Sequence, residues 1–401
     1  MFKMLRPVGN KIHYSSQPLP KKFFSPFRSH YYQSGTAALS ATLLAAQQAN
    51  DKAISVKKVL LPAYTCPDLI SAARYANVEP VLIDFEPDLP WMNLEIIEEK
   101  IKTDNAVIAI IAVNFLGIPE RIEQILKLIE GYNITLIEDS AQDFPAAIEN
   151  FQPHSDFIVS SFGRGKPLGL LGGGIVLTGK KDLSDYLPKT LSTKPAFTEN
   201  LKYWLKVNIY NTLIKPFTYY LVNHFTTLKL GKTVYKPLTV INSCPEYVIK
   251  QIVHNYSHYC TQQTPNLFYT KMLRRLNSSE IIDLPYICRV NMNKQLLRYP
   301  LLIKNPVLHK KLIHALTKSD LGISVMYKAP LPDIEGITDD MFKEKTDITN
   351  ARYFASRLLT LPTHTDVSQK DLNRIEEIFN TVVNKSSNDN INSSLTTQHN
   401  K

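Results

Sequence analysis

A lysine in a glycine-flanked loop is the residue of this chain best placed for covalent chemistry. Lys166 lies in the sequence SSFGRGKPLG, after one apolar run and before a second one at 175–177. Upstream, the apolar sequence ITLIED ends in Asp139. A lysine that can lose its proton, with a carboxylate at a neighbouring strand end, is what a Schiff-base cofactor such as pyridoxal phosphate requires. Either segment alone is weak evidence, because most charged side chains are solvated.

Small residues near the start of the chain could hold the phosphate of such a cofactor. In the sequence SGTAAL a turn opens a helix, and the backbone N–H groups of Gly35, Thr36 and Ala37 would lie at the positive end of the helix dipole. A plain N-cap by Ser34 or Thr36 is the alternative. The hydroxyl of Ser161 would add a donor to the same phosphate.

Two further polar residues could act on the cofactor ring. If Asp139 faces the pyridine nitrogen, its negative charge keeps that nitrogen protonated and makes the ring an electron sink. The alternative for Asp139 is a helix cap. Gln142 follows three residues later and could hydrogen-bond the ring hydroxyl. Lys166 would form the Schiff base and then move a proton between the substrate carbon and the cofactor carbon.

Strands and helices alternate from residue 31 to about 180, and they must position these residues. Several strands are apolar without alternation, which predicts an α/β fold with a mainly parallel sheet covered on both faces. Ligands of such sheets bind beyond the carboxyl ends of the strands. We therefore expect Tyr64, Asn114, Asp139 and the loop 161–166 to converge on one crevice. The predicted helices are 35–50, 68–76, 94–102 and 118–131, and the predicted strands are 59–62, 80–85, 106–113 and one from 135.

The residue pattern of the chain changes after about residue 183, from alternating strands and helices to a different composition. The stretch 200–225 mixes aromatic residues with lysines, and Pro216 interrupts any single long helix. We interpret it as a pair of helices that pack on the body of the protein or on a second subunit. The alternative is a basic, aromatic surface that makes weak contact with a membrane interface.

The remainder of the chain predicts a second, smaller α/β domain. Its expected strands are 296–303 and 322–325, and its expected helices are 307–319 and an amphipathic one at 369–383. The last residues are rich in Asn, Ser and Thr and lack apolar periodicity, which is typical of disorder. The expected division is an N-terminal arm (1–30), a large cofactor-binding domain (31–250) with a helical insert (183–250), a small domain (251–385) and a disordered tail (386–401).

Composition narrows the classes of function without selecting one. The chain has 401 residues, a net charge of +10 and four scattered cysteines, which suit neither a disulfide scaffold nor a zinc site and favour a reducing compartment. The first residues lack the apolar core of a signal peptide, and no apolar run is long enough for a membrane span. We expect a cytoplasmic protein. The basic residues are dispersed and no nucleic-acid-binding module is recognisable, so we expect no nucleic-acid partner. An anionic small molecule or an acidic membrane surface explains the charge equally well.

The order of these motifs resembles one known family. The sequences SGTAAL, LPAYTCPD, EPVLIDFEPD, IEDSAQ, SSFGRGK and GGG follow one another as in the sugar aminotransferases of the DegT/DnrJ/EryC1/StrS family, which depend on pyridoxal phosphate and have fold type I. The resemblance extends over roughly residues 20–385, because LLTLPTH and the helix from 369 match the C-terminal end of the family.

The resemblance implies roles for individual residues. Lys166 matches the Schiff-base lysine, Asp139 the partner of the pyridinium nitrogen, and Gln142 the glutamine near the ring hydroxyl. Gly35, Thr36 and Ser161 match the phosphate ligands, with Ala37 beside them. It also implies a homodimer with active sites near the interface, glutamate as the usual amino donor and a nucleotide-linked keto-sugar as acceptor.

Three departures from the family pattern bear on the substrate. Cys66 replaces the aromatic residue that stacks on the cofactor ring in much of the family, although Tyr64 is near. The Asn-Tyr-Arg segment that reaches the partner subunit's phosphate is not recognisable between 180 and 260. Arg164 and Gly165 replace smaller residues before Lys166. Since Lys166 itself is present, the chain does not resemble the dehydratase branch, in which histidine takes that place.

The family therefore implies an aminotransferase acting on a nucleotide-activated or lipid-linked keto-sugar, in the synthesis of a surface polysaccharide or a glycosylated metabolite. A lyase or aldolase of fold type I shares the lysine and the aspartate. A homologue that has lost turnover and serves as a binding or regulatory partner is a second alternative. Arg298 and Lys328 are candidates for contacts to the diphosphate of the substrate, although solvated surface positions are the ordinary interpretation of both.

Overall fold

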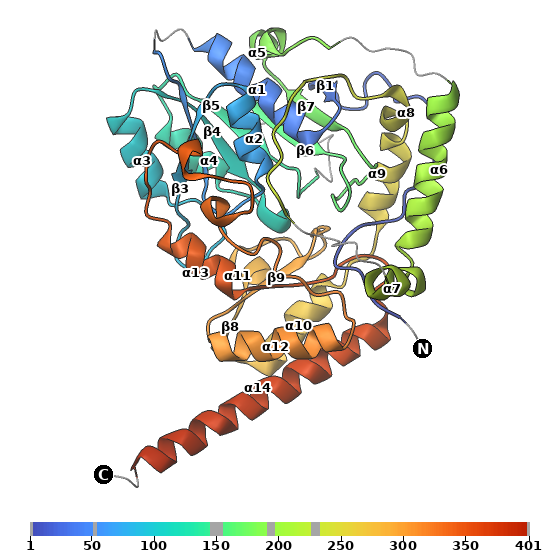
Figure 1. The fold of residues 1–401 in the computed structure, drawn as a ribbon, viewed down its shortest axis with the longest axis vertical. Helices are drawn as coiled ribbons and strands as arrows, with labels where there is room; N and C mark the ends of the chain where they lie inside the picture. Colours follow the sequence, from blue (N-terminus) through green and yellow to red (C-terminus); the bar gives the residue numbers. More distant parts are fainter. Residues whose placement is uncertain (1–2, 51–53, 145–154, 191–196, 226–232, 399–401) are drawn as a thin grey trace.

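Seven strands form the central sheet of the computed structural model, in the order β1-β7-β6-β5-β4-β2-β3 (Figure 1). The five strands from β3 to β6 in this order are parallel, whereas β7 runs antiparallel to both β6 and β1. The predicted mainly parallel α/β sheet is confirmed. The structure describes residues 3–50, 54–144, 155–190, 197–225 and 233–398, with side chains to residue 385. The strands are β1 (Arg28–Tyr32), β2 (Lys58–Pro62), β3 (Glu79–Ile83), β4 (Val107–Val113), β5 (Thr135–Asp139), β6 (Phe157–Ser161) and β7 (Gly174–Thr178).

Helices cover both faces of this sheet, and successive residues of a strand pack on opposite faces. Leu61 of β2 lies in one apolar core with residues of α1 and α2, whereas its neighbour Leu60 lies in another core with Ile97 of α3 and Ile125 of α4. Both faces are therefore dry, which explains why the strands are apolar throughout. The helices of this part are α1 (Gly35–Ala49), α2 (Asp68–Tyr75), α3 (Leu94–Thr103), α4 (Ile122–Leu128) and α5 (Lys181–Tyr186).

The helix predicted over 118–131 is shorter in the structure. A 3-10 turn occupies Phe115–Gly117, Ile118 is extended, and α4 begins only at Ile122. Pro119 gives the reason, because the residue before a proline is disfavoured in the α conformation. The other helices and strands that the sequence predicts around the large sheet lie within two residues of their predicted bounds.

A three-stranded antiparallel sheet, in the order β10-β9-β8, is the centre of the second part of the chain. Figure 1 shows α12 and α14 on the side of this sheet that faces away from the large sheet. The elements are α8 (Glu246–Ile249), α9 (Ile252–Thr261), α10 (Asn266–Leu276), β8 (Ile281–Asp283), α11 (Leu284–Ile287), β9 (Tyr299–Ile303), α12 (Pro306–Lys318), α13 (Thr349–Arg357), β10 (Leu358–Leu361) and α14 (Gln369–Gln398).

Two sequence predictions for this part differ from the structure. The strand expected at 322–325 is only an isolated bridge between Ser324 and Thr360, because Gly322 and Met326 have positive φ and turn the chain away on either side. Helix α14 continues to Gln398, where the sequence predicts disorder from residue 386. Side chains beyond Lys385 lie outside the described residues, and the division into domains stays a prediction.

The aromatic, basic stretch forms two helices, α6 (Phe197–Leu213) and α7 (Pro216–Phe225), so Pro216 interrupts the helix as predicted. Residues 191–196 and 226–232 of the predicted insert lie outside the described residues. Tyr203 and Val207 of α6 are buried against the body. No described helix combines the length and apolar character that crossing a bilayer requires. Large apolar side chains stay exposed on the other faces of α6 and α7, namely Phe197, Leu201, Trp204, Leu205, Ile209, Leu213, Phe217 and Leu221.

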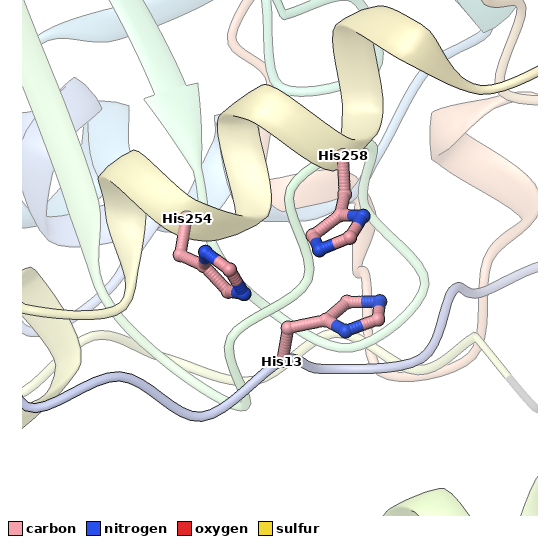
Figure 2. Close-up of side chains that lie close together, drawn as sticks. All are labelled: His13, His254 and His258. Atoms are coloured by element: carbon pink, nitrogen blue, oxygen red, sulfur yellow. The ribbon is translucent and has the colours of Figure 1, made fainter.

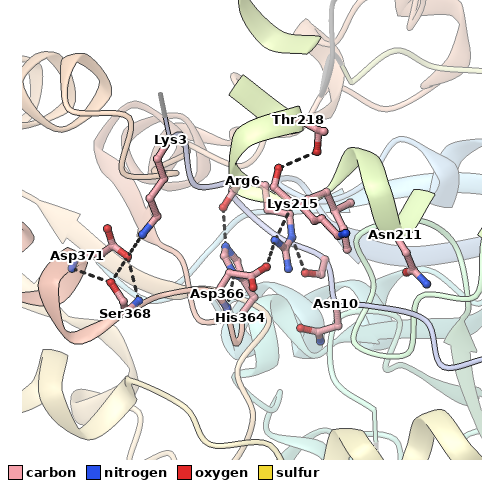
Figure 3. A network of polar contacts seen from close by, with 12 residues as sticks. Lys3, Arg6, Asn10, Asn211, Lys215, Thr218, His364, Asp366, Ser368 and Asp371 are labelled. Carbon is pink, nitrogen blue, oxygen red and sulfur yellow. Dashed lines mark hydrogen bonds and ion pairs between the residues drawn. The ribbon is translucent and has the colours of Figure 1, made fainter. Parts of the chain in front are cut away.

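The N-terminal arm ties α6 to the start of α14 through the polar network of Figure 3. The buried Arg6 donates from Nε to the Gly9 carbonyl and from Nη1 to the Ile214 carbonyl, at 2.8 Å each, and it pairs with Asp366. His364 Nε2 donates to the Arg6 carbonyl at 2.8 Å, and its Nδ1 accepts the N–H of Asp366. Both ring nitrogens are thus used by a neutral imidazole.

Because of this network, we expect the free energy of unfolding to depend on pH. Burial and the nearby Arg6 lower the pKa of His364 to about 4. Since the folded pKa lies below the unfolded value of about 6.5, the stabilisation is complete above that value and is lost as the pH falls toward 4. We expect His364→Gln to reduce the fall in unfolding free energy between about pH 7 and pH 5 by roughly 1–2 kcal/mol, measured by urea denaturation.

The matched control is His314→Gln, which changes an exposed histidine of α12. That variant should keep the pH dependence of the wild-type chain. An equal acid sensitivity of His364→Gln and wild type would show that the network does not require a neutral imidazole.

Candidate functional site

One cavity gathers most of the predicted site residues at the carboxyl ends of β5 and β6 and at the start of α1. The residues come from segments far apart in the sequence, as expected for the edge where parallel strands end. Its lining consists of Gly35, Thr36, Leu39, Cys66, Asp68, Leu69, Asp139, Ala141, Gln142, Val159, Ser161 and Lys166.

Lys166 is presented by a tightly folded loop after β6. Its backbone N–H donates to the Gly163 carbonyl at 3.3 Å. Gly165 has a φ of +71°, in the left-handed region that favours glycine, and a Cβ on Gly169 would lie 3.3 Å from the Gly163 carbonyl oxygen. Within the described part of the chain, the half-buried ammonium of Lys166 has no hydrogen bond or ion pair. A partly buried, unpaired amine is free to react with a carbonyl group.

Asp139 ends β5, buried between β4 and β6. Its carbonyl accepts the N–H of Asn114 at 3.0 Å, and its Oδ1 accepts the N–H of Ala141 at 2.9 Å, so both backbone and side chain are held in place. Burial raises the pKa of Asp139, and the positive charge of Lys166 opposes this rise. A second cation at the free side of the carboxylate would stabilise its ionised form further.

The start of α1 approaches β6 so closely that only glycine fits. A Cβ on Gly35 would lie 2.6 Å from Cβ and 2.8 Å from Oγ of Ser161. Ser34 caps the helix by accepting the N–H of Ala37 at 3.1 Å, so the plain cap considered from the sequence is present. The Ala37 N–H is therefore engaged within the protein, while Thr36 and Ser161 line the cavity.

Gln142 connects the cavity to the second part of the chain. Its Oε1 accepts the N–H of Leu116 at 3.2 Å, and its Nε2 donates to the hydroxyl of Tyr327 at 3.3 Å. One hydrogen of the Gln142 amide is thus left for a ligand. Cys66 lies across the cavity, and burial raises the pKa of its thiol to about 12, so the thiol stays protonated at neutral pH.

Two residues expected in the crevice lie beside it instead. The ring of Tyr64 is fully buried among Phe85, Phe115 and Phe354, and its hydroxyl donates to the Tyr327 carbonyl at 2.8 Å. Asn114 donates from Nδ2 to Glu138 and Ser140 within the protein. Tyr64 thereby joins the two parts of the chain, and neither residue lines the cavity.

Arg298 and Lys328 lie in opposite environments. Lys328 is exposed, which agrees with a solvated position. For Arg298 the surface interpretation is wrong, since Nε and Nη1 are buried without a hydrogen-bond partner in the described protein. Burial lowers the pKa of Arg298 to about 10, with Tyr327 and Tyr219 among the groups around it. Two buried guanidinium nitrogens without a partner are costly, which makes Arg298 a candidate for binding an anion.

Sequence reasoning missed Asp68 and Tyr327 as site residues. Asp68 lines the cavity from the first turn of α2, and the motif LPAYTCPD that contains it was the available signal. Tyr327 follows the turn at Met326, whose φ is +57°. No spacing in the sequence links Tyr327 to Gln142, 185 residues earlier.

Comparisons with known proteins agree on one family. A model of the DegT/DnrJ/EryC1/StrS aminotransferase family matches residues 31–211 and 258–380. The chain is 30% identical to GDP-perosamine synthase of Escherichia coli O157:H7 over 153 residues, which are 38% of this chain and 40% of that protein. It is 21% identical to dTDP-4-amino-4,6-dideoxy-D-glucose transaminase of Shigella dysenteriae over 349 residues, 86% of this chain and 83% of that one.

Solved structures agree on the fold. PseC of Helicobacter pylori, an aminotransferase involved in the biosynthesis of pseudoaminic acid, superposes with a TM-score of 0.68 at 14% identity, covering 96% of this chain and 100% of its own. In the match with GDP-perosamine synthase the chain spans about two-fifths of that relative's length. The family model, however, matches segments that carry both sheets, and the chain therefore belongs to the DegT/DnrJ/EryC1/StrS aminotransferase family.

Proposed function

We propose that this chain is a pyridoxal-phosphate-dependent aminotransferase that moves an amino group from glutamate to the ketone of a nucleotide- or lipid-linked sugar, in the cytoplasm, for polysaccharide or glycoconjugate synthesis. The observation that carries the proposal is the unpaired Lys166 ammonium in one cavity with Asp139 and the Gly35–Ser161 contact. Relatives named as GDP-perosamine synthase and a dTDP-sugar transaminase support the substrate class.

The residues of the cavity fit the cofactor. Ser161 and the first turn of α1 would hold the phosphate, where the missing Cβ of Gly35 lets the helix approach the strand. Asp139 would face the ring nitrogen and Gln142 would donate its remaining amide hydrogen to the ring hydroxyl. When bound, the cofactor supplies an electron sink. Lys166 Nζ would carry the proton from the α-carbon of glutamate to the cofactor carbon, and in the second half-reaction from the cofactor carbon to the sugar carbon. Glutamate would thereby leave as its 2-oxo acid, and the ketone of the sugar would become an amine.

The other interpretations of the same site are less well supported. A lyase or aldolase would share Lys166 and Asp139, but the matching family model describes aminotransferases and one relative is named a dTDP-sugar transaminase. A homologue without turnover would have no use for a lysine kept unpaired beside a buried carboxylate, since such an arrangement costs stability. Amino transfer is therefore the function that we propose.

Borohydride reduction tests the cofactor site directly. We expect reduction of the chain incubated with pyridoxal phosphate to fix one cofactor per chain, and peptide mass mapping to place it on Lys166. Lys166→Ala should lose this label. Lys180→Ala, which removes an exposed lysine that pairs with Asp156, should keep it. Label distributed over several surface lysines would contradict the assignment.

Arg298 offers a test of how the amino donor is bound. We propose that its guanidinium takes the carboxylate of glutamate, because it is buried next to Tyr327, whose hydroxyl contacts Gln142 of the cavity. Arg298→Gln should raise the KM for glutamate about 10- to 100-fold, the equivalent of about 1.5–3 kcal/mol for a hydrogen bond to a charged group. Steady-state kinetics with a keto-sugar acceptor measures this.

The matched control is Lys328→Gln, which removes an exposed positive charge of the same part of the chain and should leave both KM values unchanged. A rise confined to the KM of the sugar would instead assign Arg298 to the diphosphate. A thermal melt of each variant shows that its fold is retained.

We also propose a homodimer whose interface includes the exposed apolar face of α6 and α7. Eight large apolar side chains on adjacent helices are more than the scattered single residues of an ordinary monomer surface. Two-fold dimers are the commonest oligomers, and a second copy would bury this face. The inner side of α6 contacts the loop of Lys166, since the Tyr203 hydroxyl donates to the Leu170 carbonyl at 2.9 Å.

Analytical ultracentrifugation tests this interface. Wild type should sediment with the mass of two chains and the double variant Leu205→Glu/Ile209→Glu with the mass of one, whereas Lys206→Glu on the same helix should stay dimeric. A monomeric wild type that co-sediments with anionic vesicles at low salt would assign the face to membrane contact instead.

A further inference from the structure

Three histidines from distant segments meet on the surface beside α9. His13 belongs to the N-terminal arm, and His254 and His258 lie one turn apart on the same side of α9. Figure 2 shows both helix side chains directed toward the arm, with the ring of His13 under that of His258. The closest ligand nitrogens of the three rings all lie within 4.8 Å of one another.

The arm is held against α9 by side-chain amides, which fixes the position of His13. Asn255 accepts the N–H of His13 at 2.8 Å and donates to its carbonyl at 2.9 Å. Gln251 does the same for Ser15, accepting its N–H at 2.7 Å and donating to its carbonyl at 2.9 Å. Asn255 and Gln251 are themselves buried. The backbone under the cluster is therefore preorganised, and only the imidazole rings need to adjust.

The present ring arrangement is close to that of a metal site without being identical to it. The rings of His13 and His258 are stacked, with centroids 3.7 Å apart and an angle of 14° between planes, whereas His254 lies edge-on to both. Stacked rings direct their lone pairs side by side, while a zinc ion with bonds of about 2.0–2.1 Å needs converging nitrogens. His254 and His258 are exposed, so rotation of their side chains meets little resistance.

We propose that His13, His254 and His258 form a three-imidazole site for a divalent transition-metal ion such as Zn²⁺, which joins the arm to α9. Neutral imidazoles suit zinc, copper and nickel, whereas hard cations such as Mg²⁺ and Ca²⁺ prefer oxygen ligands. Three protein ligands leave a coordination position for water.

The site also adjoins the loop that carries Lys166. His13 and His258 line a cavity of about 230 Å³ together with Pro167, Leu168 and Gly169. Metal binding would therefore rigidify the arm next to the proposed active site. No local spacing in the sequence indicates this site, because His13 lies more than 240 residues from His254 and His258.

Isothermal titration of the full-length, tag-free chain with Zn²⁺ tests the proposal. We expect one ion per chain in wild type, and at least a ten-fold loss of affinity in His254→Asn and in His13→Asn. His314→Asn, which removes an exposed histidine of α12, should bind as wild type does. Zn²⁺ should raise the melting temperature of wild type and of the control only, since an ion that binds the folded state alone stabilises it.

His13→Asn keeps the contacts to Asn255, because these use only the backbone of residue 13. Equal melting temperatures of wild type and variants without metal will show that the fold is intact. Failure of wild type to bind Zn²⁺, or binding that His13→Asn and His254→Asn leave unchanged, would overturn the proposal. Equal stabilisation of wild type by Mg²⁺ would do so as well.

Discussion

The close approach of α1 to the ends of β6 and β7 is the contact on which the rest of the site depends. A Cβ on Gly35 would overlap Ser161, and a Cβ on Gly174 would lie 2.4 Å from the Ser34 carbonyl oxygen. Two glycines on facing segments thus let a helix start lie directly on the strand edge. This contact fixes where the positive end of α1 points relative to Ser161, and the loop that follows Ser161 carries Lys166.

The parts of this arrangement that follow from local pattern could be predicted from the sequence. Apolar strands alternating with helices predict a parallel sheet, and a parallel sheet brings Asp139 and Ser161 to one edge because both end strands. Lys166 follows Ser161 by five residues and must lie near it. The positions of these three residues thus follow from their sequence neighbours and from the general geometry of α/β folds.

Features created by contacts between distant segments could not be predicted. The sequence around Arg298 predicts a strand with one charge. The groups that interact electrostatically with its guanidinium, Tyr64, Tyr219 and Tyr327, come from three other segments. The strand expected at 322–325 failed for a similar reason. Gly322 has a φ of +67°, and a Cβ there would lie 2.5 Å from the carbonyl oxygen of Arg6, so the arm determines the local conformation.

Several half-buried lysines have partners within the protein. Lys58 pairs with Asp104 and Lys294 pairs with Asp143, while Lys57 donates to the carbonyls of Gln47 and Asn50. The Lys166 ammonium and two nitrogens of the Arg298 guanidinium have no such partner among the described residues. Because an unpaired charge in a buried or half-buried position destabilises the fold, its presence at two positions around Tyr327 and Gln142 supports the proposal that ligands complete the site. A carbonyl compound suits the amine and an anion suits the guanidinium, which is the pair that a cofactor aldehyde and an amino-acid carboxylate would supply.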